Sequence, residues 1–508
     1  MGKGGNGQNG ENKNLMWIED EGKARLVDYE ALLHSKVRKV KEFPTMTMAE
    51  VKRLVQEEGR VLIVIKGRVL DVKNFAKTHP GGVGPIFHGA GKDMTDQFMQ
   101  FHSHETHKRL INFCVATVDA KDQEARGKVG LQEDWDAFTQ QVLEEGLYES
   151  DYFFFIKMFA LACSFLVACL LFITDTVGGG SYSAHMVGAV CFGMFLQQMN
   201  FLGHDTGHNG ITHNTTYDAA IGILVGNFLT GVGIGWWKDS HNNHHIATNS
   251  IDGDADIQHM PFICCNPKIM EKPFFSTWHK NWHNACGLME RYLLRYQHVV
   301  YYPAIMGFAR YNLYVQSWIH IFSGKSRMPA IEAVSLFGFA IWVGSLISLL
   351  PSASERIQFV LLSHAVAGIL NIQITLSHFC MEVYFGSPYS HDKGIEDQWV
   401  WTQMKTTLAL VCPEWLDWFH GGLQYQDVHH LMPRVPRHNL RALRPRIQAL
   451  CRKHGCDVSP EVTFWEANVM TMKLVRECAL KAYKLKPGHE ESNELKNSPL
   501  FDTLFARG

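Results

Sequence analysis

Histidines in three tight clusters are the residues of this sequence best suited to chemistry. The residues of each cluster stand at positions i and i+4, or at i, i+3 and i+4, so one face of a helix presents them together. The clusters are "HDTGH" with His204 and His208, "HNNHH" with His241, His244 and His245, and "QDVHH" with Gln426, His429 and His430. Seven converging imidazoles would form a metal site, although imidazole suits iron, zinc and copper alike. The spacing therefore predicts a metal centre without naming the metal.

Each cluster lies beside a block of apolar residues that could position it at a membrane surface. A hydrocarbon core of about 30 Å requires about 20 apolar residues in a helix. Candidate blocks cover residues 152–173, 186–202, 219–237, 331–350 and 357–379. The connectors "TDTVGGGSYSA" and "PSASER" contain a single cation, Arg356, which places both on the lumenal side. If 219–237 also crossed, the clusters would face opposite compartments, so we interpret it as interfacial or re-entrant and predict four crossings.

The segment "YYPAIMGFARYNLYVQSWIHIF", residues 301–322, mixes aromatic and polar residues. This character suits a helix at the membrane interface. The stretch "DGDAD", residues 252–256, is a candidate calcium loop, but an EF-hand loop from Asp252 would need Gly at 257 and Glu at 263. Ile257 and Ile263 stand there instead, so calcium is rejected.

A second set of candidate residues lies in a small α+β unit near the N-terminus. Thr45 or Thr47 is a candidate N-cap for "MAEVKRLVQEE", and "RVLIVIKGRVLDV" predicts two strands around a Lys-Gly turn. The motif "HPGG" follows with His79, and then "KDMTDQFMQFHSH" with His102 and His104. By itself "HPGG" could be no more than a turn.

The length of 508 residues predicts two or three domains, at about 150 residues each. We predict a mobile tail over 1–41, an α+β domain over 42–118, a linker and amphipathic helix over 119–150, a membrane domain over 151–455 and a C-terminal tail over 456–508. A net charge of -2 gives no reason to expect a nucleic-acid partner. The 12 cysteines include no Cys-x-x-Cys and are interpreted as reduced.

The membrane part resembles the membrane-bound front-end desaturases that are fused to cytochrome b5. In this family three histidine boxes hold a di-iron centre, and the last box reads Gln-x-x-His-His. Gln426 looks like the family's glutamine, whose amide could approach iron or orient a neighbour; alternatively it only caps or spaces its helix. Asp427 and Val428 stand where the family often has Ile-Glu. His378, in "LSHFCME", matches a further ligand of the family, or it is a structural histidine at the membrane face.

The N-terminal unit is similar to cytochrome b5, in which two histidines bind the iron of haem b from opposite sides. A haem with both axial positions filled transfers electrons and does not bind oxygen. The resemblance implies His79 as the first ligand and His102 as the second. One extra residue around "HGAGKD" leaves His104 as an alternative.

The resemblance implies an enzyme that uses O2 and two iron ions to introduce a double bond into a lipid alkyl chain. Electrons would pass from NADH through a separate cytochrome b5 reductase to the haem. The match around "WWKDSHNNHHIATNSIDGDADIQH" is most similar to the sphingolipid delta-8 branch, while delta-5 and delta-6 fatty-acid desaturases and a hydroxylase on the same scaffold remain alternatives. The family implies the endoplasmic reticulum membrane with both termini cytosolic. A membrane haem carrier would leave the three histidine clusters unexplained, and a zinc transporter would leave "HPGG" unexplained.

Overall fold

The computed structural model describes residues 43–122, 130–389, 398–456 and 460–485, and the backbone of two further strands, β1 (Leu15–Asp20) and β2 (Lys23–Asp28). The chain forms two compact units. The first comprises Met1–Phe75 and Gly89–Arg126, and the second comprises Ala76–His88 and Gly127–Gly508. Each unit has a hydrophobic core of its own.

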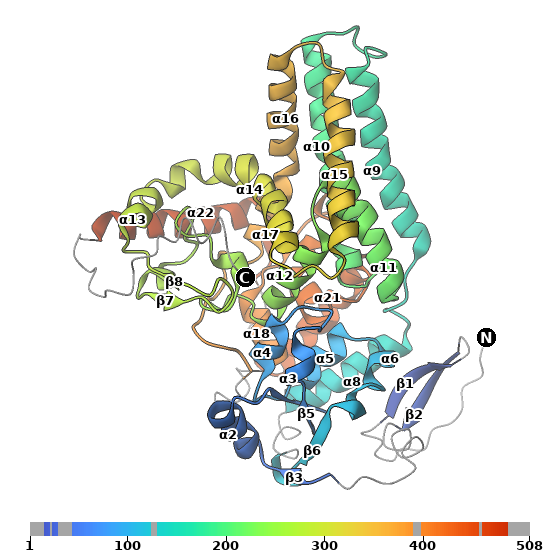
Figure 1. The fold of residues 1–508 in the computed structure, drawn as a ribbon, viewed down its shortest axis with the longest axis vertical. Coiled ribbons are helices and arrows are strands. Elements are labelled where there is room, and N and C mark those ends of the chain that lie inside the picture. Colours follow the sequence, from blue (N-terminus) through green and yellow to red (C-terminus); the bar gives the residue numbers. More distant parts are fainter. Residues whose placement is uncertain are drawn as a thin grey trace. The chain divides into compact units, whose positions relative to one another are not determined.

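The first unit contains a four-stranded sheet flanked by short helices (Figure 1). In sheet order the strands are β3 (Thr45–Met46), β6 (Cys114–Val118), β5 (Arg68–Asp71) and β4 (Leu62–Ile65). Strand β3 is parallel to β6, and the other pairs are antiparallel. The helices along this part of the chain are α2 (Met48–Glu58), α3 (Lys73–Ala76), α4 (Gly84–Gly89), α5 (Thr95–Phe101), α6 (His104–His107) and the 3-10 helix η1 (Leu110–Asn112). The segment Ala76–His88, which contains most of α4, belongs to the second unit.

Local sequence explains where α2 begins and how the chain turns between β4 and β5. The Thr47 hydroxyl accepts a hydrogen bond from the backbone N–H of Glu50 at 3.1 Å and caps α2, as predicted. Lys66 and Gly67 have φ of 47° and 69°, the conformation that a two-residue turn between antiparallel strands requires. The predicted hairpin around Lys-Gly is therefore confirmed.

The segments expected as tails contain regular structure. Strands β1 and β2 pair antiparallel within 1–41, and the remaining residues up to 42 lie outside the described residues, so the mobility of this segment stays a prediction. Residues 456–508 contain the helix α22 (Phe464–Lys484). Its apolar face, including Ala467, Val475 and Cys478, is buried in the core of the second unit, which is why a helix forms there.

Among the described residues of the second unit, four helical segments are long and apolar enough to cross a membrane, the number predicted from the sequence. They are α9 (Tyr152–Ile173), α10 (Tyr182–Gly207), α15 (Pro329–Ser348) and the continuous pair α16 (Ala353–Ala367) and α17 (Ile369–Leu376). Residues 219–237 are instead divided among α11 (Thr215–Gly222), the π-helix η2 (Ile223–Phe228) and the start of α12 (Ile234–Ile246). Gly231, at φ 76°, interrupts this segment.

The rest of the second unit surrounds one end of these four segments (Figure 1). Its helices are α8 (Gly130–Glu144), α13 (Leu288–Leu294), α14 (Gln297–Phe322), α18 (Trp399–Thr406), α19 (Asp417–His420), α20 (Gln426–Leu431), α21 (Leu440–Lys453) and α22. The 3-10 helices are η3 (Ala255–Ile257), η4 (Pro267–Met270), η6 (Glu414–Leu416), η7 (Leu423–Tyr425) and η8 (Arg437–Asn439). Strand β7 (Phe274–Phe275) pairs antiparallel with β8 (Trp282–His283), and β9 (Leu410–Val411) pairs parallel with β10 (Val462–Thr463).

Candidate metal centre

Four segments that are distant in the sequence bring the predicted metal-binding residues together. The C-terminal end of α10 carries the first box, α12 carries the second and α20 carries the third, while His378 follows the end of α17. Buried in this centre are His208, His244, His245, His378, Gln426, His429 and His430, with His204 and His241 partly buried. All nine residues predicted as metal ligands therefore lie at one end of the four apolar segments.

The first group of ligand atoms comes from His204, His208, His241 and His429, and these atoms lie within 4.8 Å of one another. The rings of His204 and His429 have centroids 4.5 Å apart, and those of His208 and His241 are 5.0 Å apart. Four imidazoles at such a separation can coordinate one metal ion.

The second group consists of His244, His378 and His430, again with ligand atoms within 4.8 Å of one another. Nε2 of His244 lies 3.3 Å from Nε2 of His378. All three side chains are almost completely buried. Because His378 joins two box histidines in this group, its position agrees with the role that the family resemblance implies.

His245 lies between the two groups. Its Nε2 is 3.1 Å from Nε2 of His241 in the first group. Its ring stacks on that of His430 in the second group, with a centroid distance of 4.0 Å and an interplanar angle of 17°. The two groups are therefore neighbours, connected through one imidazole.

Gln426 faces both His378 and a small cavity. Its Nε2 is 3.2 Å from Nε2 of His378, and its buried Oε1 has no hydrogen-bond partner among the described residues. A cavity of about 10 Å³ is lined by Gln426, His204 and His429. That volume is close to what one water molecule requires, so a small polar ligand could reach the amide.

The donor set fits metal ions. Nε2 atoms of His204, His429 and His430 are buried and have no hydrogen-bond partner among the described residues. A buried polar atom without a partner is costly, and coordination of a metal would remove that cost. Donors consisting of imidazoles and one amide suit iron, zinc or copper and do not suit calcium.

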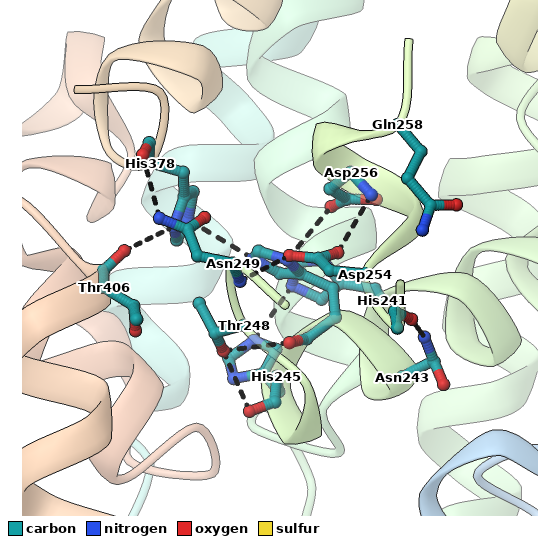
Figure 2. A network of polar contacts seen from close by, with 12 residues as sticks. His241, Asn243, His245, Thr248, Asn249, Asp254, Asp256, Gln258, His378 and Thr406 are labelled. Atoms are coloured by element: carbon teal, nitrogen blue, oxygen red, sulfur yellow. Dashed lines mark hydrogen bonds and ion pairs between the residues drawn. The ribbon is translucent and has the colours of Figure 1, made fainter. Parts of the chain in front are cut away.

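Residues outside the boxes hold these imidazoles in place (Figure 2). Nδ1 of His244 lies 2.9 Å from Oδ2 of Asp254. Nδ1 of His378 lies 3.2 Å from the carbonyl oxygen of Thr406, a contact drawn in Figure 2. Nδ1 of His430 lies 3.0 Å from Oε1 of Gln403. Each bond uses Nδ1 and leaves Nε2 as the nitrogen that would coordinate a metal ion.

Sequence reasoning missed these supporting residues. The motif "DGDAD" was considered only as a calcium loop, yet its Asp254 is completely buried against His244. Asp254 and Asp256 also form a possible metal-binding group with His244, with ligand atoms within 4.8 Å. In the sequence, the one signal of this role is an aspartate ten residues after His244 and directly after Gly253.

Burial and neighbouring charge act on these imidazoles in different ways. Burial lowers the pKa of His241, His245 and His429, so these rings stay neutral, which is the form that binds metal. Burial also opposes the charged form of His244, but the carboxylates of Asp254 and Asp256 outweigh it and raise its pKa to about 9. A carboxylate that stabilises positive charge on His244 would also strengthen that ring as a ligand of a cation.

The two predicted haem ligands have similar local geometry. Nδ1 of His79, in the second unit, lies 2.8 Å from the carbonyl oxygen of Gly82. Nδ1 of His102, in the first unit, lies 3.1 Å from the carbonyl oxygen of Phe98, and its ring stacks on that of Phe98 at 4.2 Å. In each ring a proton on Nδ1 leaves Nε2 as the nitrogen able to bind iron, which is the form that an axial haem ligand requires. The side chain of His104 lies outside the described residues.

Comparison with known proteins identifies the class to which this fold and centre belong. Residues 181–460 match the fatty acid desaturase family, and residues 47–119 match the cytochrome b5-like haem/steroid binding domain. The chain therefore belongs to the fatty acid desaturase family and carries a cytochrome b5-like domain at its N-terminus. It is a lipid desaturase, an oxidoreductase, and its four apolar segments make it a membrane protein. The family implies iron, and the cytochrome b5-like domain implies haem.

Individual relatives cover most of the chain. A Delta(8)-fatty-acid desaturase of Helianthus annuus is 36% identical over 83% of this chain and 89% of its own length. An Acyl-lipid (9-3)-desaturase of Borago officinalis is 35% identical, with coverage of 84% and 91%. A Delta 8-(E)-sphingolipid desaturase of Emericella nidulans is 31% identical, with coverage of 78% and 88%. The resemblance to cytochrome b5-fused front-end desaturases is confirmed.

Proposed function

We propose that the chain is an O2-dependent di-iron desaturase that introduces a double bond at the delta-8 position of a sphingoid long-chain base. The observation that carries the metal assignment is the pair of buried histidine groups connected by His245. The proposed ligands are His204, His208, His241, His244, His245, His378, Gln426, His429 and His430.

Bound iron would supply the O2 chemistry that cleavage of an unactivated C–H bond requires and that acid–base side chains cannot supply. The protein's own contribution is to fix and shield the ligands. Asp254 and Gln403 hold His244 and His430 by their Nδ1 atoms, which fixes the orientation of each ring. Burial of these rings keeps bulk water away from them, which would protect chemistry at bound iron from side reactions with water.

The electron supply proposed for the centre is a haem b bound by His79 and His102. Two imidazoles that each use Nδ1 for a backbone carbonyl support axial ligation through Nε2. NADH would donate electrons through a separate cytochrome b5 reductase. The proposed haem domain covers residues 42–118, close to the 47–119 that match the cytochrome b5-like domain.

The proposed location is the endoplasmic reticulum membrane, with both termini in the cytosol. The connector after α9 and that after α15 contain few cations, which supports a lumenal position for both. Two pairs of crossings then place all three boxes on the cytosolic side, where a cytosolic reductase could deliver electrons.

The substrate proposal is supported by relatives whose names specify the delta-8 position. These names include both fatty-acid and sphingolipid desaturases, so fatty acids are the alternative substrate class. The alternative activity is that of a delta-6 or delta-5 fatty-acid desaturase. Yeast expressing the chain and fed phytosphingosine or C18 fatty acids would compare the two classes in one host. A new unsaturated long-chain base with unchanged fatty acids supports the proposal, whereas new fatty acids with unchanged bases would overturn it. A product that gains oxygen instead of losing two hydrogens would indicate a hydroxylase.

A further inference from the structure

A cavity of about 800 Å³ lies between α14, α17 and α22, apart from the candidate metal ligands. Its wall is largely apolar and includes Met306, Ile369, Ile372 and Phe419. The volume is within the range of about 300–1,000 Å³ that small-molecule sites occupy. The Tyr302 hydroxyl donates to Oδ1 of Asn468 at 2.8 Å, which holds α14 and α22 together at this cavity.

The charged part of the cavity is cationic. Lys473 and Arg476 stand three residues apart on α22 and are exposed, and the lining contains no carboxylate. Neither cation forms an ion pair with a carboxylate of the described residues. Lys and Arg without carboxylate partners beside an apolar wall suit an amphiphile with an anionic head, and arginine matches phosphate in particular.

Large apolar side chains are exposed on the surface around the cavity, as expected for a surface that contacts a membrane. On α14 the side chain of Phe308 is 73% exposed, and on α22 that of Trp465, which also lines the cavity, is 74% exposed. In Figure 1, α13, the first part of α14 and α22 run across the direction of the four apolar segments. Helices with large exposed apolar residues and this orientation suit the plane of the interface, where the cavity would meet lipids.

Helix α17 connects the cavity with the metal centre. Ile369 at its first position lines the cavity, and His378 follows its last residue, Leu376. A helix of 8 residues is about 12 Å long. If the head group is held at one end of α17, a fixed length of alkyl chain lies between it and the candidate ligands at the other end. The distance from the head group would then determine which carbon atoms receive the double bond.

We propose that this cavity binds the head-group end of a membrane lipid that carries a phosphate, with Lys473 and Arg476 as the residues that contact the phosphate. The inference rests on the proposed function and specifies the form in which its substrate is presented. A free long-chain base is a cation and would be repelled by the two side chains. The substrate is then a phosphate-bearing sphingolipid rather than the free base.

The experiment uses the full chain in a non-ionic detergent and two photoactivatable probes that differ only by phosphate: a ceramide with a diazirine in its acyl chain, and the 1-phosphate of the same ceramide. Labelled peptides are identified by mass spectrometry. We expect the phosphate probe to label α14, α17 or α22 several-fold more than the neutral one. Lys473→Gln and Arg476→Gln should each reduce this labelling by about 5-fold, since an exposed charge contact contributes about 1 kcal/mol.

Lys484→Gln is the matched control, because it removes one exposed cation from the same helix outside the cavity and should leave labelling unchanged. Lys473→Arg, which keeps the positive charge, should retain the preferential labelling by the phosphate probe. Equal labelling by both probes, or labelling that neither glutamine variant reduces, would overturn the proposal. Preferential labelling by a photoactivatable acyl-CoA would also overturn it and assign the cavity to a water-soluble thioester. Labelling requires no turnover, so a chain that labels as expected but forms no delta-8 product would count against the proposed delta-8 activity alone.

Discussion

The amide nitrogen of Gln426 lies 3.2 Å from Nε2 of His378, so the glutamine of the third box touches the one candidate ligand that belongs to no box. The two residues come from α20 and from the end of α17. A glutamine that served only as a helix spacer would not need to be buried beside that nitrogen. The contact favours a role for Gln426 in orienting His378 or in binding a ligand itself.

Replacement of Gln426 by alanine should lower desaturase activity by about 100-fold, because it removes the amide beside His378. The measurement is product formation in yeast together with the iron content of the purified protein. Gln424→Ala is the matched control, since the Gln424 amide bonds to Asp417 at 2.9 Å and does not touch the cluster. Near-normal turnover of Gln426→Ala would show that this residue is only a spacer.

Asp254→Asn should reduce iron retention by about 10- to 100-fold, because His244 loses the carboxylate that fixes its Nδ1 proton. Iron per chain, determined by mass spectrometry after dialysis against a chelator, is the readout. Asp252→Asn changes a neighbouring aspartate that instead accepts from the backbone N–H of Gly386, and should retain iron. Equal iron in all three proteins would exclude this role for Asp254.

Gly207→Ala should disturb the centre by steric overlap. A Cβ atom at this position would lie 1.9 Å from the ring of Trp237, which stacks on His241 at 4.3 Å. Such overpacking costs about 1–3 kcal/mol of folding stability, and displacement of Trp237 would move His241. Thermal unfolding and iron content are the measurements. Gly203→Ala, one turn earlier, meets its nearest atom at 3.9 Å and should behave like the parent protein.

His79→Ala and His102→Ala should each abolish the low-spin haem spectrum of the full chain, because each removes one axial ligand. His104→Ala should leave that spectrum unchanged. Absorption spectra of the oxidised and reduced proteins provide the comparison. Loss of haem in His104→Ala with retention in His102→Ala would identify His104 as the second ligand.

The sequence was sufficient to predict the three boxes, the hairpin around Gly67 and the number of apolar crossings, because these depend on short-range spacing and on segment length. The supporting contacts were not predictable in the same way. Gln403 reaches His430 because α18 packs beside α20, and the carbonyl group of Thr406 at the end of α18 reaches His378 after α17. No spacing in the sequence reports either contact. The helix α22 was not predicted, because residues 456–508 were interpreted as a tail.

The placement of His241 and His244 on α12 limits how far the distance between the two histidine groups can change. One residue belongs to the first group and the other to the second, and three residues of helix separate them by about 4.5 Å along the axis. The separation of the two groups is thus determined by helical pitch and not by a loop or by the closure of one domain on another. Thermal movement of α10 or α20 could loosen individual ligands, but the distance between the two positions would stay constant as long as this turn of α12 remains intact.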